Sequence, residues 1–140
     1  MTFSITGRCA KTGQLGIAIS SSSIAVGARC PWLRPGVVAV STQNVTLPAL
    51  GDRALEQLAL GCSPEQARDL ALASDEYRQF RQLALIDHQG RTAHFSGSET
   101  LGCHHAVSGE QCVGAGNLLA NQAVIEALVR GLETSEGCLA

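Results

Sequence analysis

Apolar residues gather in short runs through the first third of the chain, a pattern typical of β-strands. Residues 3–9 and 15–22 are two such runs, and the segment between them contains Gly13, which suits a tight turn. This pattern predicts an antiparallel hairpin. A third run, residues 36–42, has consecutive rather than alternating apolar positions, which indicates a strand buried on both faces.

Apolar residues recur at helical spacing in two other regions. Residues 49–60 form the first amphipathic segment, and Gly61 follows it as a residue that can end a helix. Asn121 is predicted to cap another helix near the end of the chain. The apolar face of that last helix is expected to consist of Val124, Ile125, Leu128, Val129 and Leu132.

Residues 63–66 carry the pattern of a helix start. Ser63 is a residue type that caps helices, Pro64 suits the first helical position, and Gln66 completes a capping box. The sequence therefore predicts a second helix that begins here and runs to about Ala73.

The strand pattern returns in residues 79–87 and 91–95 around Gly90, which predicts a second hairpin. Residues 107–114 are expected to form one further strand or a pair of short strands. Strands and helices are thus grouped rather than alternating. This grouping predicts an α+β protein with a single domain over residues 1–140. We expect that domain to be an αββα sandwich of antiparallel sheets with helices on the outer faces.

The last residues, 134–140, resemble a linker, because a cap-type residue is followed by a fresh apolar start. We therefore expect the sandwich to be incomplete at the C-terminus, with the remainder missing or supplied by a second chain. An incomplete sandwich leaves sheet edges or apolar helix faces uncovered, so a homo-oligomer is also expected.

Composition and charge narrow the function classes. With 45% hydrophobic residues and a formal net charge of −2, the chain is expected to be a soluble globular domain with its own core. The arginines and the single Lys11 are scattered, so no nucleic-acid partner is expected. No apolar run approaches the ~20 residues of a membrane span, and no secretion signal is evident, which predicts a cytoplasmic protein without a membrane partner.

The six cysteines are widely spaced and form no C-x-x-C pair, which favours reduced thiols over a disulfide scaffold. Cys103, His104 and His105 are zinc-ligand types, yet adjacent strand residues point to opposite faces and cannot all converge on one ion. The glycine spacings of nucleotide-binding loops do not occur. The sequence therefore predicts neither a metal nor another cofactor.

Thr2 carries the most distinctive chemistry, because it is a hydroxyl residue at the start of the first predicted strand. If Met1 is removed, Thr2 holds both a nucleophilic oxygen and an α-amine with a pKa near ~8, and that amine can act as the base. Thr2 is therefore the candidate nucleophile. The alternative is a β-branched residue that merely begins an edge strand.

Hydroxyl and amide side chains also follow the ends of the neighbouring predicted strands. Thr42 is a second candidate catalytic residue. Candidates for binding the substrate are Ser20, Ser22, Gln43 and Asn44. Polar groups at buried strand ends need partners, because an unpaired group costs ~1 to 3 kcal/mol. The alternative is a polar turn that bonds its own backbone.

Asn117 is a further candidate for binding the substrate. It follows Gly114 and Gly116, which permit close backbone approach, so its amide can reach a substrate carbonyl. The alternative for Asn117 is a helix cap or a turn. His94 lies on a short predicted strand without a neighbouring carboxylate to orient it, which favours a hydrogen-bonded surface histidine over an acid or base.

Several segments have the order and spacing of one known family, over nearly the whole chain. They are residues 1–5, 12–16, 25–28, 31–32, 35–40, 42–43, 61–67, 81–83, 87–93, 94–97 and 116–119. These segments resemble the domain-of-unknown-function family 1028, which is Ntn-hydrolase-like. The resemblance implies an αββα fold and, by analogy with that superfamily, hydrolysis of amide bonds.

The chain departs from the family pattern at three positions. Leu47 and Leu50 stand at the asparagine and tyrosine positions of an Asn-Pro-x-Tyr-Gly stretch, and Ala115 stands where a glutamine often precedes Gly-Asn. An apolar pocket that has lost such polar groups can bind a ligand without reacting with it.

Three functions are therefore considered. The first is an N-terminal-nucleophile amidohydrolase, in which Thr2 attacks a small-molecule amide or peptide-like substrate and Thr42, Gln43 or Asn117 stabilises the oxyanion. The second is a non-catalytic binding or assembly module that retains the Ntn-like scaffold. The third is self-cleavage near Ala140, in which a downstream chain brings its own nucleophile.

Overall fold

The computed structural model describes residues 1–139, which form two four-stranded antiparallel sheets and three α-helices. The first sheet has the order β2-β1-β8-β7, with β1 (Thr2–Arg8), β2 (Leu15–Ser21), β7 (His105–Gly109) and β8 (Cys112–Asn117). The second has the order β3-β4-β5-β6, with β3 (Pro31–Arg34), β4 (Val38–Asn44), β5 (Arg81–Asp87) and β6 (Thr92–Ser96). The helices are α1 (Ala49–Ala59), α2 (Pro64–Ala73) and α3 (Ala123–Glu133).

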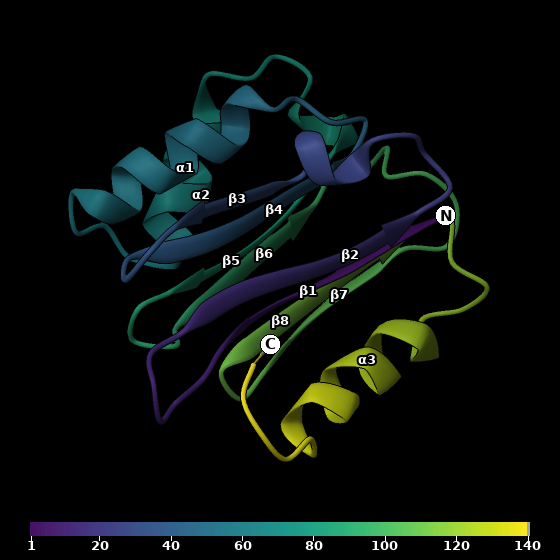
Figure 1. Cartoon of the computed structure of the whole chain (residues 1–140). Helices are drawn as coiled ribbons and strands as arrows, with labels where there is room; N and C mark the ends of the chain where they lie inside the picture. Colours follow the sequence, from purple (N-terminus) through teal and green to yellow (C-terminus); the bar gives the residue numbers. More distant parts are fainter. Residues whose placement is uncertain (140) are drawn as a thin grey trace.

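The two sheets stack face to face, as Figure 1 shows, with helices on both outer faces. Helices α1 and α2 cover the second sheet, and α3 covers the β8 and β7 half of the first sheet. The predicted α+β class and αββα arrangement are confirmed. Two single-turn 3-10 helices complete the described elements, η1 (Val26–Ala28) and η2 (Arg78–Phe80).

Most predicted elements are present close to their expected bounds. The capping box of α2 is formed: the Ser63 hydroxyl accepts from the Gln66 amide, and the Gln66 side chain accepts from the Ser63 amide. Gly61 and Gly90 both adopt the positive φ that their turns require. Helix α3 begins one residue later than predicted, with Gln122 at the N-cap position.

Strand β3 was not predicted from the sequence. It is held by Trp32, which packs against α1 where Gly51 leaves room for the indole ring. A Cβ atom on Gly51 would lie 2.3 Å from that ring. The glycine is therefore what allows α1 to sit directly on β3.

The residues after α3 turn back onto the first sheet. Leu139 lies over the paired glycines Gly7 and Gly16, where a Cβ on Gly16 would be 3.2 Å from the leucine side chain. The C-terminal segment thus covers part of the sheet surface that α3 leaves open.

The largest apolar core lies between the second sheet and its two helices. Alternate residues of β4 and β5 point into it, for example Val38, Val40, Leu83 and Leu85. The alternate residues point toward the first sheet and, apart from Ile86, are small or polar. The layer between the sheets is apolar around Ala84 but consists of amides and hydroxyls toward the end of the sandwich that holds Thr2.

Candidate functional site

Gln82, on β5, is the centre of a hydrogen-bonded group of buried polar side chains between the sheets. Its Oε1 accepts from Gln43 Nε2 at 2.9 Å and from Asn117 Nδ2 at 3.1 Å. Its Nε2 donates to Ser96 Oγ and to the Gly116 carbonyl oxygen, both at 3.0 Å. One side chain therefore joins strands of both sheets.

Gln43 extends this group toward β1. Its Oε1 accepts from Ser4 Oγ at 2.8 Å and from Ser41 Oγ at 3.3 Å, and the two serine hydroxyls lie 3.2 Å apart. We call Ser4, Ser41, Gln43, Gln82 and Asn117 the amide cluster. All five are at most 2% exposed and none is ionisable, so the cluster is a neutral, satisfied polar network.

Thr2 lies at one end of the amide cluster. It pairs with Asn117 on β8 and with Ser21 on β2, and its Oγ1 lies 2.8 Å from Ser21 Oγ. Thr2 and Ser4 are two residues apart on β1, so their side chains share the face that meets the second sheet. Thr2 is part-buried, whereas Ser4 beneath it is fully buried.

Met1 precedes Thr2 and carries the terminal amine. The ammonium donates to Ser22 Oγ at 3.2 Å, and the Met1 carbonyl accepts from the Ser22 amide at 3.1 Å. Met1 itself is 48% exposed. Removal of this residue would transfer the α-amine to Thr2, beside Ser21 and Asn117.

The structure brings some of the predicted site residues together and separates others. Gln43 and Asn117 lie in the amide cluster next to Thr2, and Ser22 binds the terminal amine. Ser20 is exposed and pairs with Phe3, so it points to the other face of the first sheet.

Thr42 and Asn44 point away from the amide cluster because they alternate with Ser41 and Gln43 along β4. Thr42 Oγ1 donates to the Arg29 carbonyl at 3.4 Å. Asn44 has a φ of 73° and ties two loops together: its Nδ2 donates to the Phe80 carbonyl and its Oδ1 accepts from the Leu101 amide. Both residues therefore shape the loops around the site.

Four residues of this region were not predicted from the sequence: Ser4, Ser21, Ser41 and Gln82. Gln82 had a readable signal, because it is a buried-strand amide directly before the apolar run Leu83–Ile86 of β5. Ser4 stands two residues from Thr2 and therefore shares its face. Ser21 could be placed only once the register of β1 and β2 was known.

The ionisable groups with shifted pKa values lie outside the amide cluster. The Arg81 guanidinium donates to Asp75 at 2.6 Å and holds the pKa of that carboxyl below its ordinary value. Arg81 also donates to the Val45 carbonyl at 2.7 Å, which fixes the chain just beyond β4. Burial lowers the pKa of His94, and the nearby positive charge of Arg68 adds to this effect.

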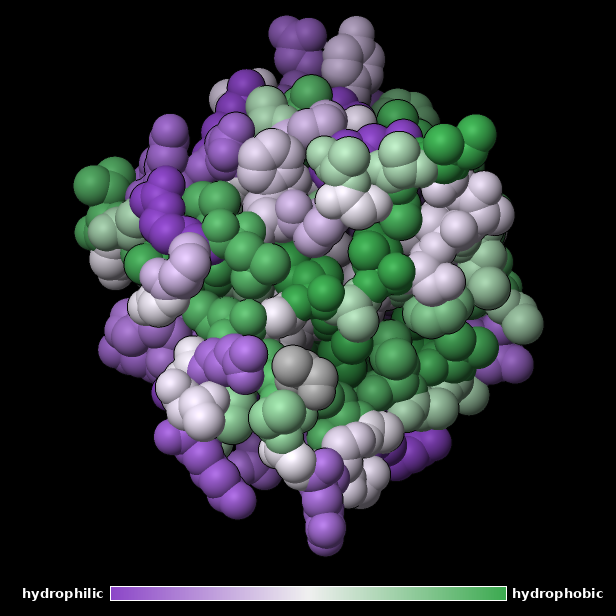
Figure 2. Space-filling model, viewed as in Figure 1, coloured by the Kyte–Doolittle hydropathy of each residue, from purple (hydrophilic) through white to green (hydrophobic). Residues whose placement is uncertain are grey.

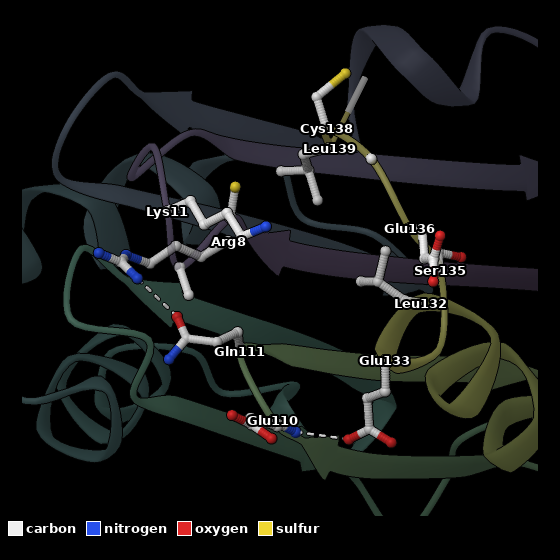
Figure 3. Close-up of a pocket in the computed structure, with 13 residues that line it drawn as sticks. Arg8, Lys11, Glu110, Gln111, Leu132, Glu133, Ser135, Glu136, Cys138 and Leu139 are labelled. Atoms are coloured by element: carbon white, nitrogen blue, oxygen red, sulfur yellow. Dashed lines mark hydrogen bonds between the residues drawn. The ribbon is translucent and has the colours of Figure 1, made fainter.

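The large cavity of about 700 Å³ lies at the opposite end of the sandwich from Thr2. Figure 3 shows Arg8 reaching Gln111 on one side of this cavity, while Leu132 and Glu133 enter it from α3. A smaller cavity of about 290 Å³ lies on the outer face of the β1–β2 hairpin, against Leu132 and Leu139. Neither is lined by a residue of the amide cluster.

Within residues 1–139, no group of three or more histidine, cysteine or acidic side chains is arranged to hold a metal ion. His104 Nδ1 lies 3.1 Å from the Gly102 carbonyl, and His105 Nε2 lies 3.9 Å from Glu126.

No helix in the described part of the chain has the length and apolar content needed to cross a membrane.

Fold and site together define an α+β sandwich with a neutral amide network between its sheets and a threonine at one end. The chain belongs to the family of unknown function DUF1028, whose model matches residues 2–140. The family resemblance seen in the sequence is thereby confirmed. No protein of curated function matches the chain.

The structure is also similar to the crystal structure of protein SPO2555 from Silicibacter pomeroyi, a protein of the same family. The TM-score is 0.94 at 28% sequence identity, and the match covers 98% of this chain. It covers 64% of the Silicibacter protein, so this chain spans less than two thirds of that protein's length.

Proposed function

We propose that this protein is an N-terminal-nucleophile hydrolase that cleaves a small-molecule amide, with Thr2 as the nucleophile after removal of Met1. The observation that carries the proposal is the environment of Thr2: its hydroxyl lies 2.8 Å from Ser21 Oγ, and the buried amide of Asn117 is its neighbour on β8. Under this proposal the αββα sandwich is an Ntn-hydrolase-like fold.

The reaction needs groups that β1, β2 and β8 supply, together with one water molecule. The Thr2 amine takes the proton from Oγ1, and the oxygen attacks the amide carbon to form a tetrahedral intermediate. The C–N bond then breaks, the leaving amine takes that proton, and an ester on Thr2 remains for water to hydrolyse. Ser21 orients the attacking hydroxyl through its 2.8 Å contact.

Asn117 is the proposed oxyanion donor. An amide nitrogen has two hydrogens, and Asn117 Nδ2 uses one of them for Gln82 Oε1 at 3.1 Å. The second hydrogen is available for the oxyanion. Gln43 and Gln82 position Asn117, and Ser22 would bind the α-amine or the substrate. Ser20, Thr42 and Asn44 are left without a direct role because their side chains point elsewhere.

Met1 is suited to removal, because it is half-exposed and its hydrogen bonds go only to Ser22 among the described residues. The test is hydrolysis of a panel of small amides by protein whose first residue has been sequenced. Thr2→Ser should retain activity and Thr2→Ala should lose it, with the exposed Thr12→Ala as a control. Equal hydrolysis by Thr2→Ala would overturn the proposal.

One observation favours the second candidate, a non-catalytic binding or assembly module. The amides of the cluster already satisfy one another: Gln43 and Gln82 are both bonded through oxygen and nitrogen. Such a network also serves as a purely structural link between sheets. A protein that keeps Met1 and hydrolyses none of the amides would support this candidate. With either function, we propose that the protein is a homo-oligomer.

A further inference from the structure

Strand β2 forms an unprotected edge of the first sheet. It is seven residues long, and the sequence from residue 12 to residue 28 contains no charged side chain. Natural edge strands are normally shortened or guarded by charges, proline or bulges, because an open edge binds other strands. In Figure 1 β2 crosses the middle of the molecule, and Figure 2 shows apolar side chains gathered across the same region of that face.

The other three sheet edges are guarded. Strand β3 has only four residues, which begin with Pro31 and end with Arg34. On β6, Arg68 donates to the His94 carbonyl at 3.1 Å, which occupies part of the backbone. Thr92 on β6 and Ser108 on β7 are joined by a 2.8 Å hydrogen bond that links these two edges across the sandwich. Among residues 1–139, β2 is the one edge strand that is long and has none of these protecting features.

The register of the hairpin shows which backbone groups of β2 face outward. The Ser22 amide bonds to the Met1 carbonyl, and the Cys9 amide bonds to the Gln14 carbonyl, so the even-numbered residues of β2 face β1. The amides and carbonyls of Leu15, Ile17, Ile19 and Ser21 therefore point away from the sheet. No hydrogen bond within the described chain uses these outward groups.

We infer that β2 is a dimerisation edge, on which the β2 strand of a second copy of this chain pairs antiparallel about a two-fold axis at Ala18. In that register Ile17 of one copy is opposite Ile19 of the other, and Leu15 is opposite Ser21. All the outward groups then meet in pairs, which gives about eight backbone hydrogen bonds and one continuous eight-stranded sheet.

Charge and side-chain burial favour a second copy of this chain as the partner of β2. A two-fold axis at Ala18 brings the same strand of two copies together, so a strand of net charge would repel its copy, whereas this uncharged strand does not. Ile17 and Ile19 are only half-buried in one copy, and pairing would cover them further. The inference specifies the homo-oligomer proposed above and is independent of the hydrolysis, so a monomeric protein would leave the role of Thr2 untouched.

The test uses Ala18, which is exposed and would lie opposite its own copy. Molar mass is measured by light scattering and sedimentation for the full chain and for Ala18→Lys over a wide range of protein concentration. The full chain should have twice the mass of one chain. Ala18→Lys should weaken the dimer about fivefold or more, because like charges then stand directly opposite each other. Leu33→Lys, on the edge strand of the other sheet, is the matched control and should leave the dimer unchanged.

A mixing experiment separates a lost interface from a lost fold. Ala18→Lys and Ala18→Glu should each dimerise more weakly than the parent chain, and an equimolar mixture of the two should recover the dimer. A monomeric full chain would overturn the inference, as would a dimer that Ala18→Lys does not weaken. Failure of the mixture to recover the dimer would also overturn it.

Discussion

Gln82 and Asn117, which are 35 residues apart in the chain, are joined by a buried 3.1 Å hydrogen bond that links the two sheets. Gln82 Oε1 also accepts from Gln43, so one oxygen holds two amides in place. Asn117 pairs with Thr2 across β1 and β8, so this bond positions the proposed oxyanion donor beside the proposed nucleophile.

Replacement of Gln82 should therefore destabilise the protein and disturb the site together. Gln82→Leu removes the buried acceptor of Gln43 Nε2 and of Asn117 Nδ2, and we expect a loss of about 2 to 4 kcal/mol in the free energy of unfolding. Urea denaturation measures this loss. The exposed Gln89→Leu is the control and should stay within about 0.5 kcal/mol of the parent protein. A small effect at Gln82 would mean that the amide cluster does not hold the sheets together.

Gly51 offers a test of how β3 is held. Gly51→Ala places a methyl group 2.3 Å from the present position of the Trp32 ring, so the ring or α1 must move. We expect a loss of about 1 to 3 kcal/mol, as for other overpacked cores. The matched control is Gly27→Ala, where an added Cβ meets nothing within 4 Å. Equal stability of the two variants, measured by thermal unfolding, would contradict this description of the contact.

The buried Asp75–Arg81 pair should make stability depend on acid pH. Arg81 lowers the pKa of Asp75 from its ordinary value of 3.8 in the folded state. The stabilisation is therefore complete above the unfolded pKa and is lost as the pH falls through the lower folded value. Asp75→Asn should cost about 3 kcal/mol at pH 7 and should flatten the decline in the free energy of unfolding below about pH 4.

The control for this pair is Glu76→Gln, which removes an exposed carboxylate next to Asp75 in the sequence. It should change neither the stability at pH 7 nor the slope below pH 4. If Asp75→Asn keeps the acid slope of the parent protein, the pair is not the source of that slope.

Much of the fold could be predicted from local patterns. The β1–β2 hairpin and α2 have turn and cap residues that act within a few positions of one another, so the sequence displays them directly. Strand β3 could not be predicted from local patterns. It has only four residues and depends on Trp32 packing against Gly51, which is distant in the sequence.

The site could be predicted only in part, for a physical reason that β4 illustrates. All but the last of its residues are buried, so its hydrophobic pattern does not reveal which alternate set faces the other sheet. Gln43 and Thr42 were therefore indistinguishable in the sequence, although only Gln43 reaches the amide cluster. The pairing of Thr2 with Asn117 is a long-range register that local patterns do not encode.

The role of Thr2 is tested most directly by intact-mass measurement after treatment with a hydroxyl-directed acylating reagent. If Thr2 is the nucleophile, the protein lacks Met1 and gains one adduct, mapped to Thr2, which Thr2→Ala does not form. A protein that retains Met1 and gains no adduct, or an adduct that persists in Thr2→Ala, would contradict it.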